Sequence, residues 1–154
     1  MTPINARISP NFTWAELTRT GQEALQAQNR REAEAFKGAI TALANDLLEP
    51  LRAQFGPLRL NSAFRGPSVN TAVRGSKNSQ HMRGEAADLV PLREGVTLEQ
   101  MFLWVKASPL KFGQVIWECP SPTSRWLHLS LGEPWRTTRN REALYFDGKS
   151  YTPR

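Results

Sequence analysis

The chain has only two histidines, His81 and His128, and both lie in segments that also carry polar or acidic side chains. Asp88 follows His81 by seven residues, and His128 follows Asp88 by forty. Two imidazoles and one carboxylate make a set of three ligands, and catalytic zinc sites use three protein ligands and leave a fourth position for water. Cys119 is the only cysteine, so a metal here must bind histidine and carboxylate rather than a cysteine-rich site.

The residues between these candidate ligands suit a metal site. Gly84 lets the chain turn sharply between His81, expected in a loop, and Asp88, expected on a strand. Ala86 and Ala87 have small side chains, so they leave room for ligands to approach the metal. The spacing also fits a simpler interpretation, in which the histidines are ordinary surface or core residues and Asp88 is a carboxylate at a strand end.

Hydrophobic patterns predict the strands that must position these side chains. Strands are expected where apolar and polar residues alternate or where short apolar runs end in turns. They are residues 58–64 (LRLNSAF), 86–90 (AADLV), 113–118 (GQVIWE) and 125–131 (RWLHLSL), the last two joined as a hairpin by CPSPTS. The tail from Gly132 is expected to be irregular, apart from a terminal hairpin around Asp147 and Gly148.

Four helices are expected from capping residues and apolar spacing. A capping box, Thr13 with Glu16, predicts a short helix start, and Thr97 is expected to cap a helix over residues 98–107. An apolar stripe at intervals of three and four predicts one long helix from Arg30 to about Phe55, with a kink near Pro50. Residues 66–75 suit a short helix with a proline at its first position. Helices and strands that do not alternate regularly indicate an α+β domain with a small antiparallel sheet flanked by helices.

Length and composition indicate one domain and exclude several classes of protein. The chain has 154 residues, within the roughly 100–200 that a single domain usually takes. The N-terminus lacks the apolar run of a signal peptide, and no run is long enough to span a membrane, so we expect synthesis in the cytoplasm. A net charge of +6 favours an anionic partner, but the basic residues are scattered among 14 carboxylates, so nucleic acid is not expected.

The string Ser79-x-His81-x-x-Gly84-x-Ala86-x-Asp88 resembles the signature of the zinc D-Ala-D-Ala carboxypeptidase family. That family includes phage endolysins, vancomycin-resistance D-Ala-D-Ala dipeptidases and, by fold, hedgehog signalling domains. The segment before it, LNSAFRGPSVNTAVRGSKNSQH, is similar to the lead-in of small phage and prophage members. The resemblance covers most of residues 11–145, and it implies one peptidase domain over residues 1–154 with a hedgehog/DD-peptidase-like fold.

The resemblance implies a role for several residues of this sequence. It implies that His81, Asp88 and His128 bind zinc. It also implies that Arg65 binds a carboxylate of the substrate, a task for which a planar guanidinium is suited. Ser79 matches a family serine that touches the substrate or steadies the loop.

The general base departs from the family pattern. Many members carry an acidic residue three positions before the last histidine, and this sequence has Arg125 there, which cannot accept a proton. Glu118 is the best substitute, because residues of matching parity in a hairpin share one face and Glu118 would then point into the same cleft as His128. Glu85 is the second candidate, although it alternates with Asp88 and is expected to face away.

The resemblance therefore implies a zinc metallopeptidase that hydrolyses peptide bonds in peptidoglycan stem peptides, as a carboxypeptidase or an endopeptidase. A phage or prophage lysin is the expected setting; it would reach periplasmic or cell-wall murein after release, with the help of a holin, or as a virion component. The alternative is a non-catalytic zinc-binding module of the same fold that binds cell wall or a protein partner, and Arg125 favours this alternative.

Overall fold

A sheet of six strands forms the centre of the protein in a computed structural model that describes residues 1–135 and 139–154. Its strand order is β3-β4-β6-β5-β7-β8, and every neighbouring pair is antiparallel except β5 and β7. The strands are β3 (Leu58–Ser62), β4 (Ala86–Pro91), β5 (Phe112–Glu118), β6 (Trp126–Leu131), β7 (Glu142–Phe146) and β8 (Tyr151–Pro153). The expected α+β class with a small, mainly antiparallel sheet is confirmed.

The C-terminal tail is more ordered than its sequence suggests. Of the tail expected to be irregular, residues 136–138 lie outside the described part of the chain, and the rest contains β7, which pairs in parallel with β5. The expectation was wrong because β7 has no alternating pattern of its own and gains its order by satisfying the free edge of β5. The terminal hairpin is confirmed, since β7 and β8 pair around Asp147 and Gly148, and Gly148 adopts a left-handed φ of 97°.

Helical backbone runs without a break from Gln26 to Phe55, but it is not one regular helix. Its parts are α2 (Gln26–Ala33), the 3-10 turn Glu34–Phe36, α3 (Lys37–Ala42), the π-helical turn Leu43–Leu48 and α4 (Glu49–Phe55). The π turn directly precedes Pro50, which has no N–H to donate and whose ring crowds the carbonyl four residues back. A π turn at this point is a local irregularity of the helix near the proline, where the sequence predicts a kink.

The short helices begin where their capping residues predict. Thr13 and Glu16 form a capping box at α1 (Trp14–Thr18), and Thr97 and Gln100 form another at α6 (Leu98–Ala107). Pro67 occupies the first turn of α5 (Pro67–Ala72). A two-stranded sheet, β1 (Arg7–Ser9) with β2 (Phe12–Thr13), and the 3-10 turn Glu23–Leu25 complete the N-terminal part.

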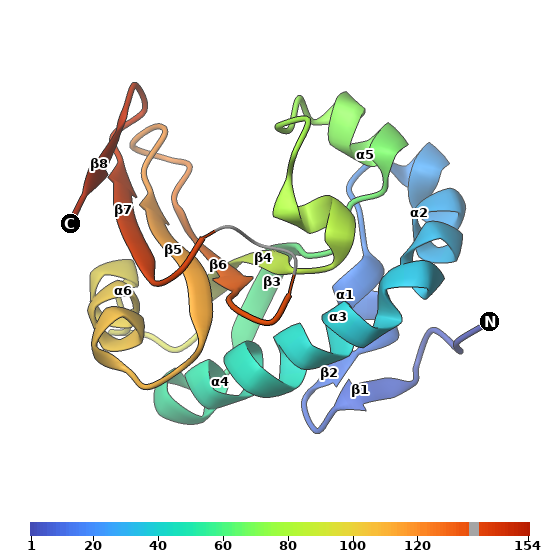
Figure 1. Ribbon diagram of the computed structural model, residues 1–154, viewed down its shortest axis with the longest axis horizontal. Helices are drawn as coiled ribbons and strands as arrows, with labels where there is room; N and C mark the ends of the chain where they lie inside the picture. The colour runs from blue at the N-terminus through green and yellow to red at the C-terminus, as the bar shows by residue number, and fades with distance from the viewer. Residues whose placement is uncertain (136–138) are drawn as a thin grey trace.

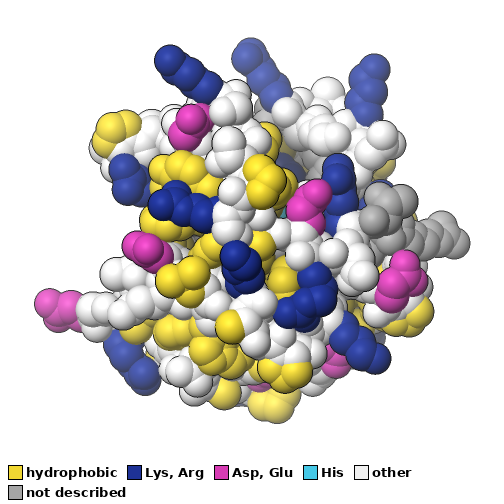
Figure 2. All heavy atoms as spheres, turned by 60° about the vertical axis from the view of Figure 1, so that its left-hand side comes forward, with side chains coloured by type: hydrophobic (Ala, Val, Ile, Leu, Met, Phe, Trp, Pro, Cys, Tyr) yellow, Lys and Arg dark blue, Asp and Glu magenta, His cyan; other side chains and the backbone are white. Residues whose placement is uncertain are grey.

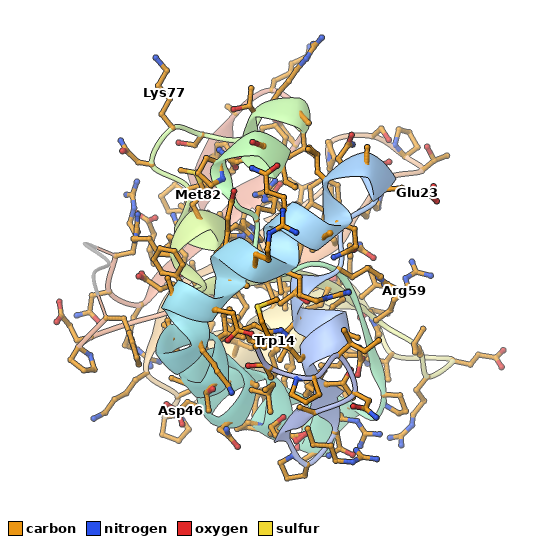
Figure 3. The ribbon with its side chains drawn as sticks, turned by 90° about the vertical axis from the view of Figure 1, so that its right-hand side faces the viewer. Trp14, Glu23, Asp46, Arg59, Lys77 and Met82 are labelled. Carbon is orange, nitrogen blue, oxygen red and sulfur yellow. The ribbon has the colours of Figure 1, made fainter. Side chains whose placement is uncertain are left out.

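The two faces of the six-stranded sheet have different surroundings. Leu89, Leu127 and Leu129 are fully buried in one core with residues of the long helical run, such as Leu43 and Leu47. Figure 1 shows that run crossing beneath the sheet, and Figure 3 shows Trp14 inside the molecule while Glu23, Asp46 and Lys77 project from its surface. Side chains that alternate with the buried leucines point to the opposite face, which is the face that carries the candidate site. Within the described ranges, no helix has the length and apolar character needed to cross a membrane.

Candidate metal centre

The 3-10 turn Gln80–Arg83 carries His81 into the interior, where it is 2% exposed. Ser79 caps this turn, since its hydroxyl accepts a hydrogen bond from the His81 backbone N–H at 3.2 Å. The turn ends at Gly84, whose φ of 70° is left-handed. A Cβ at Gly84 would lie 2.7 Å from Ile40 Cγ1, so both the backbone angle and the packing require glycine, as the sequence suggests.

A backbone carbonyl fixes the His81 ring. Nδ1 lies 2.7 Å from the carbonyl oxygen of Ala63, the residue that follows β3 by one position. A carbonyl only accepts hydrogen bonds, so Nδ1 carries the proton and Nε2 keeps its lone pair. That Nε2 lies 3.3 Å from Asp88 Oδ2. The arrangement is typical of a metal-binding histidine, which donates its other N–H to a carbonyl or carboxylate.

Asp88 and His128 come from neighbouring strands, β4 and β6, and are directly paired across them. His128 Nδ1 lies 2.9 Å from Asp88 Oδ1, and His128 Nε2 lies 3.2 Å from Gln80 Oε1. One ligand atom from each of His81, Asp88 and His128 lies within 4.8 Å of the others. The donor set, two imidazole nitrogens and a carboxylate oxygen, is one that zinc and similar cations prefer, so these residues fit a metal ion.

The ionisation states of the three residues also fit a cation. Burial lowers the pKa of His81, which keeps the imidazole neutral and able to act as a ligand. Burial alone would raise the pKa of Asp88, but the nearby His81 and His128 outweigh it and hold that pKa below its usual range. A neutral imidazole and an ionised carboxylate are the forms that bind metals.

A cleft of about 930 Å³ opens over the three residues. Its floor is the open face of the sheet, and its lining includes the candidate ligands together with Arg65, Ser79, Glu118 and Tyr151. In the hairpin of β5 and β6, Ile116 pairs with His128 and Glu118 pairs with Trp126. Glu118 and His128 therefore have matching parity and share the cleft face, as the hairpin predicts.

Glu118 has the properties of a proton acceptor near neutral pH. It is 8% exposed, and burial is the main reason that its pKa is raised to about 7. The charge of Asp88 raises this pKa further, while His128 and a hydrogen bond from the Tyr151 hydroxyl lower it. A carboxylate tuned to this range is suited to general base catalysis.

Arg65 lies at the same cleft and is half-buried. One of its terminal nitrogens, Nη2, is 3.5 Å from Ser79 Oγ, and its backbone N–H donates to the His81 carbonyl at 3.0 Å. Its Nε is buried and has no hydrogen-bond partner in the described part of the chain. A guanidinium that faces a cleft with an unused donor is suited to a carboxylate ligand.

The structure separates the remaining candidates. Glu85 does not line the cleft; it is buried and accepts a hydrogen bond from Arg83 Nε at 3.1 Å, which agrees with the expectation that it faces away. Tyr151, which lines the cleft, was not among the residues predicted for the site. It arrives from β8 at the far edge of the sheet, and its only signal was an aromatic residue in the terminal hairpin.

Two comparisons relate the chain to known proteins. The profile of the Peptidase M15 family matches residues 10–117, a range that includes His81 and Asp88 and ends before Glu118 and His128. The chain is also 37% identical over 86 residues to a protein of Streptomyces albus G named zinc D-Ala-D-Ala carboxypeptidase. That match covers 51% of this chain and 31% of the relative, so the chain matches less than a third of the relative's length.

Proposed function

Because the chain belongs to the Peptidase M15 family, we propose that it is a zinc-dependent peptidase that hydrolyses peptide bonds in peptidoglycan stem peptides. The observation that carries this proposal is the meeting of His81, Asp88 and His128 with Glu118 in one cleft. The name of the Streptomyces albus G relative supports both the metal and the substrate class.

His81, Asp88 and His128 would hold the zinc ion. When bound, zinc lowers the pKa of water and polarises a carbonyl oxygen, which is the chemistry that hydrolysis of an amide needs. Asp88 provides the negative charge of the ligand set, and the Ala63 carbonyl keeps the His81 ring oriented with Nε2 free to bind.

Glu118 would move the proton. Its carboxylate accepts a proton from the attacking water and returns it to the nitrogen of the leaving amine. A pKa of about 7 suits both transfers at neutral pH, and the position of Glu118 on the same cleft face as His128 supports this role.

Arg65 would orient the substrate. Its guanidinium binds a free carboxylate of the stem peptide. Ser79 Oγ, 3.5 Å from Arg65 Nη2, helps to orient the guanidinium plane. Holding the carboxylate fixes which peptide bond lies over the metal, and such positioning accounts for a large part of enzymatic rate enhancement.

The setting that we propose is a phage or prophage lysin acting on murein outside the cytoplasm, as a carboxypeptidase or an endopeptidase. The net charge of +6 supports an anionic wall polymer as the target. Figure 2 shows Lys and Arg dispersed over the visible face with Asp and Glu between them, rather than gathered into a stripe that would track nucleic acid.

A non-catalytic wall-binding module is the second candidate, and Arg125 at the position of the family's usual acid favours it. Digestion of purified peptidoglycan separates the two. The zinc-loaded protein should release new amino groups detectable by mass spectrometry, and the His81→Ala variant should not. Binding to peptidoglycan without new amino groups would instead support the module.

A further inference from the structure

A second groove, of about 390 Å³, meets the main cleft at the metal centre. Asp88 and Trp126 line both hollows, so the two hollows adjoin at these residues. The second groove lies between the start of β3 and the turn that joins β5 to β6. Two arginines and two hydroxyl side chains dominate its lining: Arg59, Arg125, Thr123 and Ser124. We call it the arginine groove.

The arginine groove offers cationic groups whose charge is not neutralised by the protein. Arg59 uses Nε to bind Asn61 Oδ1 at 3.3 Å, and Arg125 uses Nε to bind the Ser121 carbonyl at 3.4 Å. Among the residues described, no carboxylate forms an ion pair with either arginine. Both side chains are exposed, and Figure 3 shows Arg59 extending outward from the body of the protein. The Nε bonds orient the two guanidinium groups and leave their terminal nitrogens available.

Among the described residues, Asp88 is the one carboxylate that lines the arginine groove, and both imidazoles already contact it. An anion in the groove would therefore meet two arginines and no competing free acid. Guanidinium groups bind carboxylates through paired, charge-assisted hydrogen bonds, which makes a carboxylate the ligand that fits this lining.

Along the chain, Arg59 and Arg65 lie on opposite sides of Ser62, the strand partner of Asp88. Ser62 of β3 pairs with Asp88, while Arg59 precedes Ser62 by three residues and Arg65 follows it by three. At about 3.3 Å per extended residue, Arg59 and Arg65 are separated by at most about 20 Å along the chain, with the strand partner of Asp88 midway between them. A bound peptide advances by a similar length per residue, so three residues on one side of the scissile bond reach the arginine groove.

We propose that the arginine groove is a carboxylate-binding subsite for the half of the substrate that precedes the scissile bond. The proposal rests on the proposed peptidase function and on Arg65 holding the other half. The protein should therefore prefer stem peptides that carry a free acidic group within about three residues before the cleaved bond. Arg125, at the position where many relatives carry an acid, would then serve substrate selection.

Two matched peptides test this subsite. They have the same sequence, and they differ only in that one carries a free carboxylate before the scissile bond where the other carries a carboxamide. The zinc-loaded wild-type protein should show a kcat/KM ratio of roughly ten or more in favour of the acid, the scale of a charge-assisted hydrogen bond. The ratio should fall to near one in the double variant Arg59→Gln, Arg125→Gln. Arg31→Gln, an exposed change of equal charge on α2, is the control and should keep the wild-type ratio.

The outcomes separate the two proposals. Equal rates on both peptides with wild-type protein, or a preference that persists in the double variant, would refute the subsite and leave the peptidase function standing. Hydrolysis of neither peptide would refute the peptidase function. Calorimetry of the metal-free protein then decides the subsite on its own, because the acid should still bind more tightly than the amide, and increasingly so at low salt. Equal binding of the two peptides would overturn it.

Discussion

His128 Nδ1 lies 2.9 Å from Asp88 Oδ1, and the two residues face each other directly across β4 and β6. The same carboxylate reaches His81 Nε2 at 3.3 Å with its other oxygen. Asp88 is thus the centre of the candidate metal site, with one imidazole from its own sheet and one from the loop before β4.

His81→Ala should weaken zinc binding more than about 100-fold, because loss of a ligand costs more affinity than loss of a group that only orients a ligand. Zinc content after dialysis against a weak chelator measures the change. The fold should survive, since the Ser79 hydroxyl accepts from the backbone N–H of residue 81 and that bond remains. Full zinc retention in a folded variant would remove His81 from the metal site.

Glu118→Gln should keep zinc and lose roughly two to four orders of magnitude in kcat, the usual contribution of acid–base catalysis. The amide is nearly isosteric but cannot accept a proton. Zinc analysis and muropeptide hydrolysis, measured on the same preparation, separate binding from chemistry. Glu85→Gln is the matched control and should retain activity, because Glu85 does not line the cleft. Turnover close to wild type in Glu118→Gln would place the base elsewhere.

The pH dependence should follow Glu118. Only its deprotonated form accepts a proton, so kcat/KM should rise with pH through the Glu118 pKa, about 7 in the metal-free protein and lower once a cation is bound. Tyr151→Phe removes a hydrogen bond that lowers this pKa, so the acidic limb should shift to higher pH. Tyr145→Phe, a tyrosine packed edge-on against Trp117, is the control and should not move it. An unchanged pH profile of kcat/KM in Tyr151→Phe would argue against a hydrogen bond from Tyr151 to Glu118.

Arg65→Lys should raise KM at least about tenfold for peptides with a free terminal carboxylate, because lysine keeps the charge but loses the planar fork. Zinc content should not change. The matched substrate is the same peptide with an amidated terminus, on which wild type and variant should differ little. A similar KM increase on both substrates would show that Arg65 supports the loop rather than the substrate.

Gly84→Ala should destabilise the fold by about 1–3 kcal/mol, through a left-handed backbone angle and a clash with Ile40. Gly95 also has a left-handed φ, of 85°, but a Cβ there meets nothing within 4 Å. Gly95→Ala therefore isolates the backbone contribution, and the difference between the two thermal midpoints measures the packing against Ile40. Equal decreases in the two thermal midpoints would mean that Ile40 moves at no cost in stability.

The sequence predicted the features that depend on contacts within a few residues. The capping box of Thr13, the helix cap at Thr97, the turn at Gly84 and the strand that presents Asp88 are set by local hydrogen bonds and backbone preference. The shared face of Glu118 and His128 also followed, because a hairpin fixes the parity of its two strands.

Only the tertiary structure decided the features that join distant segments. The Ala63 carbonyl that orients His81, the parallel pairing of β7 with β5, and the approach of Tyr151 to Glu118 involve segments separated by 18 to more than 30 residues. So does the meeting of Arg59 and Arg125 beside Asp88. Such contacts form when whole elements pack to bury their apolar faces. The pattern within one segment does not specify which distant element will lie beside it.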